Sequence, residues 1–249
     1  MYKLSKLAGS VIVATAALGG ASAALADGYS RAPKVAYERP SDWSGVYFGL
    51  SSGYEWSSIR GSFPDAGTNF GTVNYDTGIV GAHLGVQHQF GSIVLGVEGN
   101  WMSTFVDTQK NNTCPIGGTS FCGARLDSVL TIGPRVGWAA GHWMPYVTGG
   151  YATTRFEFSG GPTSPPANVS ESAGTRNNGW YIGGGVEWMV SPGWTAGLEY
   201  RHYELNAQTA LDFSPAGTPV ERVRLDPTLD TVTARVTWKF GRESAVPLK

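Results

Sequence analysis

The segment WSGVYFGLSSGYEW, from Trp43 to Trp56, has the pattern on which the fold prediction rests. Large apolar side chains alternate along it with glycine and polar residues. The large apolar positions are Val46, Phe48, Leu50, Tyr54 and Trp56. The small or polar positions are Gly45, Tyr47, Gly49, Gly53 and Glu55. A period of two is typical of a β-strand whose two faces meet different surroundings.

Seven more segments of about a dozen residues repeat this alternation. They span 78–90, 93–106, 126–139, 145–158, 179–190, 194–205 and 229–240. In the segment 145–158 the dipeptide Gly149-Gly150 obscures which residues share a face. Eight such segments are enough to close a small barrel.

The connections between the segments alternate in length. Short ones lie at 91–92, 139–143 and 191–193, and long ones near 57–74, 107–125, 159–177 and 206–228. Short turns on one side and long loops on the other are typical of an outer-membrane barrel, and a soluble β-sandwich lacks this organisation. We therefore predict an all-β fold, an eight-stranded antiparallel up-and-down transmembrane β-barrel over residues 43–240, with short periplasmic turns and long outer loops.

The N-terminus resembles a signal for export. Lys3 and Lys6 precede an apolar run from Leu7 to Leu18, and Ala24-Leu25-Ala26 matches the small-x-small pattern of a cleavage site. The run is too short to span a bilayer as a helix, which needs about 20 residues. We expect a signal peptide over 1–26, cleaved after Ala26, then a flexible periplasmic lead-in over 27–42, with the mature protein in the outer membrane.

Composition agrees with a membrane barrel. The chain has 35 glycines and 9 tryptophans, and only 15% of its residues are charged, whereas soluble domains carry about 25%. No later segment is apolar for long enough to form a transmembrane helix. No stripe of lysine and arginine is present, which argues against nucleic acid as a partner.

Most tryptophans fall at the periplasmic ends of the predicted strands. An aromatic girdle of this kind marks the membrane–water interface. Its expected members are Trp43, Trp138, Trp143, Trp188, Trp194 and Trp238.

Along the predicted strands, the charged residues occupy the same alternate positions as the small and polar residues, and therefore lie on the same face. If the apolar face meets lipid, these charges line the lumen and pair there, because an unpaired buried charge is costly. The expected network consists of Glu98, Arg135, Glu187, Glu199, Arg201 and Arg235. Three uses remain open for it: a salt-bridged plug, since eight strands leave room only for side chains, a narrow ion path, or, least favoured, catalysis by the carboxylates.

Other reactive residues suggest little chemistry. Cys114 and Cys122 lie close together in a long loop, which in an exported protein predicts a loop disulfide rather than a metal site. His202, with Glu204 and Ser191 nearby, is the only local candidate for a catalytic group, and it shares the parity of the interfacial aromatic residues. We expect no enzymatic activity, no metal and no cofactor.

Several motifs together resemble a known family. They are WSGVYFG at 43–49, GVE at 96–98, RVGW at 135–138, PYVTGG at 145–150, GGGVEW at 183–188, LEY at 198–200 and VTWKF at 236–240. In this order they resemble the small outer-membrane β-barrels of alphaproteobacteria, called porin-family or outer-membrane immunogenic proteins, which are similar to the transmembrane domain of OmpA. The resemblance implies an abundant, surface-exposed barrel with structural, immunogenic or host-contact roles, and it adds haem binding as a minor alternative.

Two features depart from the family pattern. A short C-terminal extension, 241–249, follows Phe240, where members usually end on the aromatic residue that the assembly machinery is thought to recognise. Pro134 lies inside a predicted strand, and its missing N–H predicts a β-bulge.

The function expected from the sequence is that of a non-enzymatic barrel that supports envelope integrity and presents surface loops. The alternative is a narrow porin for ions or small solutes. The expected partners are outer-membrane lipids and lipopolysaccharide, and the barrel-assembly machinery during biogenesis; host or surface partners stay open.

Overall fold

The computed structural model describes residues 41–65, 67–104, 112–113, 120–162, 171–213 and 219–240. The predicted signal peptide, nearly all of the lead-in and the C-terminal extension lie outside these residues. Within them, no helix is long and apolar enough to cross a bilayer.

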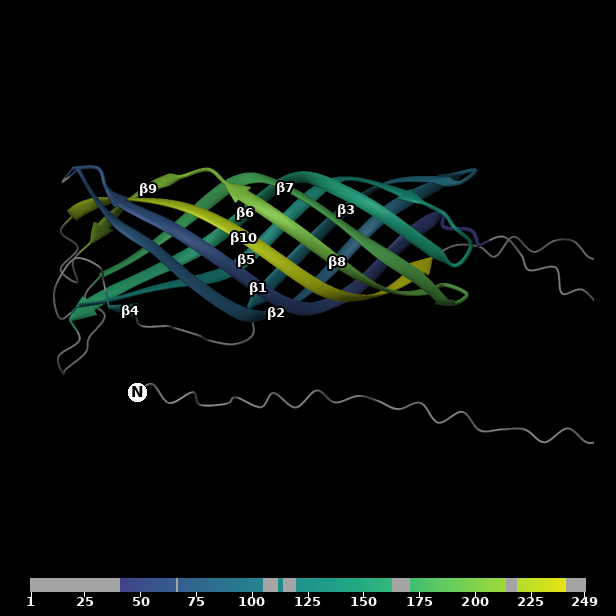
Figure 1. Ribbon diagram of the computed structural model, residues 1–249, viewed down its shortest axis with the longest axis horizontal. Helices are drawn as coiled ribbons and strands as arrows, with labels where there is room; N and C mark the ends of the chain where they lie inside the picture. Colours follow the sequence, from purple (N-terminus) through teal and green to yellow (C-terminus); the bar gives the residue numbers. More distant parts are fainter. Residues whose placement is uncertain are drawn as a thin grey trace, which may run out of the picture. The chain divides into compact units, whose positions relative to one another are not determined.

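Eight long antiparallel strands close into a barrel, as predicted (Figure 1). They are β1 (Gly45–Phe63), β2 (Thr68–Phe90), β3 (Ile93–Thr104), β5 (Ser120–Trp138), β6 (Trp143–Pro162), β7 (Glu171–Ser191), β8 (Trp194–Leu205) and β10 (Pro219–Phe240). Each pairs with the next in this order, and β1 pairs with β10 from Val46↔Phe240 to Ser62↔Arg224. This last pairing leaves no free edge, which a β-structure in lipid requires.

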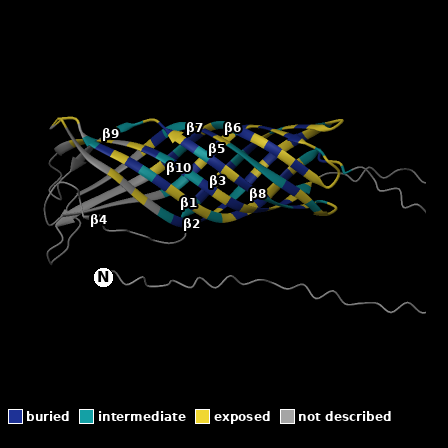
Figure 2. Ribbon diagram, viewed as in Figure 1, coloured by how far each residue is buried: buried dark blue, intermediate teal, exposed yellow. Residues whose placement is uncertain are grey.

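Buried and exposed positions alternate over most of the described part of the long strands. The pattern is visible as a chequerboard of buried and exposed positions over the barrel wall (Figure 2). In β1, Phe48 and Leu50 are exposed, whereas Tyr47 and Ser51 are buried. The sequence period of two therefore separates a lipid-facing surface from a lumen.

Tight turns join the strands at one end of the barrel. The turns after β2, β5 and β7 contain Gly91, Gly141 and Gly193, with φ of 61°, 62° and 80°. A left-handed backbone is strained for residues with a Cβ, so glycine suits these positions. The three turns coincide with the short connections of the sequence.

The strands run further toward the opposite end than the alternation predicted. Parts of the four expected long loops belong to β1, β2, β5, β6, β7 and β10, and two short strands join them there: β4 (Asn112–Thr113) beside β5, and β9 (Gln208–Phe213) beside β10 (Figure 1). The expectation of loops over these whole stretches was wrong. In the continuation of β1 the lumen-facing positions Ser57 and Ile59 stay buried, but the outward position is the charged Arg60, so the alternation of apolar and polar residues is lost while backbone pairing continues.

The bulge predicted at Pro134 does not form. Ile132 pairs with Tyr151 and Arg135 with Thr148, so the register between β5 and β6 is the same on both sides of Pro134. The partner strand carries Gly149 and Gly150 at this point, and a Cβ on Gly150 would lie 2.6 Å from the Cα of Gly133. Because these glycines let the two backbones approach closely, the sheet accommodates the missing N–H without an extra residue. The irregularity of this strand pair lies instead between Leu126 and Ser128.

Candidate functional site: the lumen of the barrel

Six charged side chains meet inside the barrel and pair with one another. The structure brings together all six members of the charge network expected from the sequence: Glu98, Arg135, Glu187, Glu199, Arg201 and Arg235. None is more than 3% exposed. Three carboxylates and three guanidinium groups balance, so the layer has no formal net charge.

Glu98 lies at the centre of this network. Its Oε1 is 2.7 Å from Nη2 of Arg201, and its Oε2 is 2.6 Å from Nη2 of Arg235. These contacts join β3 to β8 and β10, which are not its neighbours in the sheet. Glu98 therefore ties opposite walls of the barrel together.

The other two carboxylates complete the network. Glu199 accepts a contact of 2.8 Å from Nε of Arg201 and one of 2.5 Å from Nη1 of Arg235. Glu187 lies 2.7 Å from Nη2 of Arg135. Each arginine thus contacts at least one carboxylate at hydrogen-bonding distance, which offsets the cost of removing its charge from water.

Two tyrosines that the sequence analysis did not assign to the network support it. Tyr47 donates to Oε2 of Glu98 (2.9 Å), and Tyr146 donates to Oε2 of Glu199 (2.8 Å). The guanidinium carbon of Arg135 lies 3.7 Å from the ring centroid of Tyr146, a cation–π contact. The alternation in the first strand already places Tyr47 on the lumen face. The position of Tyr146 could not be predicted in this way, because Gly149-Gly150 obscures which residues of its segment share a face.

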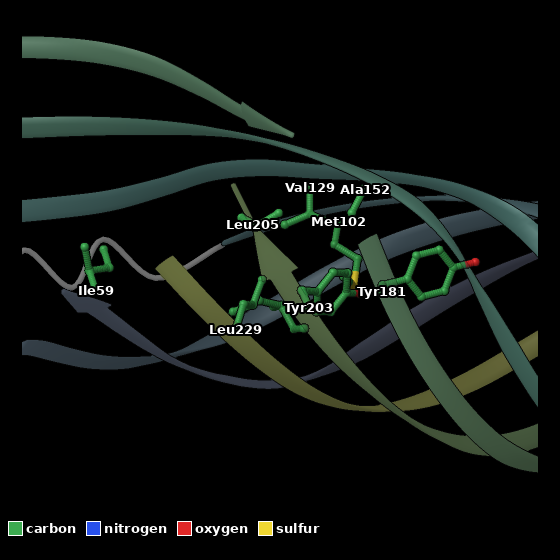
Figure 3. Packing of buried hydrophobic residues seen from close by; sticks show 9 residues of the cluster. Ile59, Met102, Val129, Ala152, Tyr181, Tyr203, Leu205 and Leu229 are labelled. Carbon is green, nitrogen blue, oxygen red and sulfur yellow. The ribbon is translucent and has the colours of Figure 1, made fainter. Parts of the chain in front are cut away.

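A ring of apolar side chains lies above the charged layer, toward the end with the long connections. Each long strand contributes at least one member (Figure 3). The members are Ile59, Ile79, Met102, Val129, Ala152, Tyr181, Tyr203, Leu205 and Leu229. The sequence predicted a lumen face dominated by glycine, with the remaining residues mostly polar. In the part of the lumen near the long connections, the positions that face the lumen carry apolar residues instead.

Trp43 does not belong to the aromatic girdle, contrary to the prediction. It is 1% exposed and packs with Val94 and Met144 at the end of the lumen that has the tight turns. The indole Nε1 of Trp43 donates a hydrogen bond to the backbone carbonyl of Gly141. The side-chain amide of Gln87 donates one to the backbone carbonyl of Trp43. Trp43 has the odd parity of Tyr47, which in β1 faces the lumen, so its side chain closes the barrel instead of meeting lipid.

The other five predicted girdle tryptophans are exposed on the outer wall near the tight turns: Trp138, Trp143, Trp188, Trp194 and Trp238. Trp143 and Trp188 stack with ring centroids 5.5 Å apart, and Trp194 and Trp238 with centroids 6.1 Å apart. Indoles in this position suit the interface between lipid and water.

The candidate catalytic group does not assemble. His202 contacts Asp230 through Nδ1 (2.8 Å), whereas Ser191 lies at the tight turn that begins β8, at the other end of that strand. Among the described residues, no group of three or more His, Cys, Asp or Glu could hold a metal ion. Cys114 and the side chain of Cys122 lie outside the described residues, so the disulfide stays a prediction.

A separate ion pair joins two extended hairpins beyond the apolar wall. Arg222 of β10 donates from Nε to Oδ2 of Asp65 (2.9 Å), in the turn between β1 and β2. These hydrogen bonds, with the positive charge of Arg222, hold the pKa of the Asp65 carboxyl below its ordinary value.

A closed barrel with an apolar outer wall, an interfacial tryptophan belt and a charge-paired lumen defines an integral β-barrel membrane protein. The chain belongs to the outer membrane protein beta-barrel domain family, whose model matches residues 12–240. Its place is therefore the outer membrane.

Curated relatives have the same location. The chain is 27% identical over 184 residues to the 25 kDa outer-membrane immunogenic protein of Brucella canis, covering 74% of each chain. It is 25% identical over 216 residues to the 31 kDa outer-membrane immunogenic protein of Brucella melitensis, covering 82% of this chain and 90% of the relative. Among solved structures, a major outer membrane protein from Thermus thermophilus is similar with a TM-score of 0.48 and 8% identity, covering 76% of this chain and 99% of that one.

Proposed function

We propose that this protein is a non-enzymatic, non-conducting barrel that supports the outer membrane and holds its outer hairpins at the cell surface. The neutral network around Glu98 is the observation that carries the proposal. Its six members contact each other across the lumen and are almost fully buried. A conducting path needs solvated or exchangeable groups, whereas these charges already have partners.

The apolar layers on both sides of the network support the same conclusion. The ring of nine apolar side chains described above, which includes Ile59 and Leu229, lies on the outer side of the network. Trp43, Val94 and Met144 lie on the side with the tight turns. An ion would have to cross two apolar layers and displace a paired charge between them, and each step is costly. The alternative function, a narrow pore, requires the ion pairs of the network to separate.

The extended hairpins support a role in surface presentation. The strands continue past the apolar wall, and the Asp65–Arg222 contact links the turn between β1 and β2 to β10. Such hairpins form a stiff platform at the surface. The Brucella relatives are named immunogenic outer-membrane proteins, which agrees with exposed hairpins acting as antigens.

Single-channel recording of the folded protein in a planar bilayer tests the proposal. We expect no discrete conductance steps from protein whose folding is shown by heat-modifiable migration in gels, in a bilayer where a known porin conducts. Reproducible steps that change in the Glu98→Gln or Arg135→Gln variant would overturn it, because they would make the network the gate of a pore.

A further inference from the structure

Two arginines lie directly opposite each other on the outer wall, above the apolar surface. Arg155 of β6 pairs in register with Arg176 of β7, and both side chains are exposed. Like charges at directly opposed positions repel and destabilise a strand pair. Neither arginine side chain forms an ion pair or side-chain hydrogen bond with a residue that the structure describes. Asp127 of β5 lies beside Arg155 at the irregularity between β5 and β6 but makes no ion pair with it, so no salt bridge among the described residues offsets the repulsion.

The position of this pair relative to the membrane follows from the same strand register. Tyr151 pairs with Trp180, and both are exposed on the outer wall at the upper edge of the apolar surface. Arg155 comes four residues later along β6. At about 3.3 Å per residue and a strand tilt of about 40°, this places the arginines about 10 Å above the aromatic pair, at the depth of lipid headgroups.

The residues below the arginines suit the rest of a lipid. Thr153 pairs with Asn178 between the arginines and the aromatic pair, so the wall passes from charged to polar to aromatic. Below these, the lipid-facing wall is apolar: Gly149 lies opposite Ile182 and Gly184 opposite Val147, and both larger side chains are exposed. An acyl chain can lie against this apolar wall.

The basic pair is confined to one side of the barrel. On the other side, the aromatic Trp56 of β1 is flanked in register by Asp76 of β2 and Asp230 of β10. These carboxylates accept hydrogen bonds from Tyr54 and Tyr200. The aromatic edge of β1 therefore has acidic residues directly opposite it in register, whereas on β6 and β7 two arginines lie directly opposite each other.

We propose that Arg155 and Arg176 bind the phosphorylated headgroup of an outer-leaflet lipid. Two guanidinium groups side by side offer paired N–H donors that match the oxygens of one phosphate group. The bound phosphate removes the repulsion between them. This binding surface lies on the outer wall and is independent of the lumen, so it adds a lipid partner to the proposed scaffold.

Arg60 provides a matched control. It is also exposed on the outer wall, four residues beyond the aromatic Trp56, as Arg155 is beyond Tyr151. In register it faces Asp226 of β10, an acidic residue, and Thr72 of β2. Changing Arg60 removes the same charge at the same height without touching the arginine pair.

The test uses the full mature chain in phosphatidylcholine nanodiscs that contain a minor fraction of lipid A, with or without its phosphate groups. Native mass spectrometry after detergent extraction counts the lipid A retained. We expect the wild-type protein to retain the phosphorylated form at least about tenfold better, since hydrogen bonds between charged groups reach that magnitude. The double variant Arg155→Gln/Arg176→Gln loses this preference, and the Arg60→Gln variant keeps it.

Three results would overturn the proposal: equal retention of both forms by the wild type, an unchanged preference in the double variant, or an equal loss in the Arg60→Gln variant. Heat-modifiable migration of each variant shows that a loss of lipid does not come from misfolding. Conductance is recorded separately, so failure of lipid binding is distinguishable from failure of the sealed-barrel proposal.

Discussion

Glu98 shows how one side chain holds opposite walls of a barrel together. It is 2% exposed and contacts arginines from β5, β8 and β10. A carboxylate in such a place is stable only because its partners bring the matching charge. The same residue on the surface would contribute little.

The Glu98→Gln variant isolates this effect. The substitution keeps the size of the side chain but leaves three guanidinium groups with two carboxylates. Breaking a buried pair on one side costs about 3–5 kcal/mol of unfolding free energy, which urea unfolding in lipid vesicles, followed by tryptophan fluorescence, measures. Glu204→Gln, at an exposed position of β8, is the control and should change stability by about 0.5 kcal/mol or less. Equal losses in both variants would contradict a special role for Glu98.

At the scale of strands, the pair β5–β6 shows why glycine recurs in this barrel. The carbonyl of Ile132 and the Cα of Gly133 occupy the space that a Cβ on Gly150 would need. By contrast, a Cβ on Gly99 of β3 would have no atom nearer than the carbonyl oxygen of Thr131, at 3.8 Å. The two glycines therefore serve different purposes, although both lie inside strands.

This contrast predicts that two alanine substitutions differ in their effect on the stability of the barrel. Gly150→Ala forces the two backbones apart and should destabilise the barrel by about 1–3 kcal/mol, the usual cost of overpacking. Gly99→Ala meets no close neighbour and should be near neutral. Urea midpoints of the two variants, compared with the wild type in the same vesicles, decide between these outcomes. A neutral Gly150→Ala would mean that β5 and β6 are not so closely packed.

At the scale of the whole molecule, closure depends on one seam between the first and last long strands. Leu50 of β1 lies directly opposite Val236 of β10, and both side chains face the outer wall. Because the sheet is closed, a change of register at this seam would alter the stagger, and with it the circumference and strand tilt, of the entire barrel.

Cysteine cross-linking tests the register of this seam, in a protein in which Cys114→Ser and Cys122→Ser remove the native thiols. Directly opposed residues have Cα atoms about 4.5–5.5 Å apart, within the range of a disulfide. We therefore expect Leu50→Cys/Val236→Cys to cross-link on oxidation, as a shift in gel migration. The offset pair Leu50→Cys/Val232→Cys, about 13 Å further along the strand, should stay reduced. Cross-linking of the offset pair alone would contradict the register.

The barrel could be predicted from the amino-acid sequence, because the alternation of side chains in each strand is a local pattern. The period from Val46 to Trp56, and its repeats, separates lipid from lumen without reference to other strands. The same parity placed all six lumen charges on one face. Turn lengths and glycines such as Gly91 marked the end with the tight turns.

The contacts of these residues, by contrast, could be read only from the three-dimensional structure. Which carboxylate meets which arginine depends on strand tilt and register around the closed sheet, and no local pattern contains these. Pairing with β6 also brought Gly149 and Gly150 beside Gly133 and Pro134, where no bulge forms, and pairing with β7 set Arg155 opposite Arg176. Local periodicity fixes the direction of a side chain, whereas its neighbours come from strands far away in the chain.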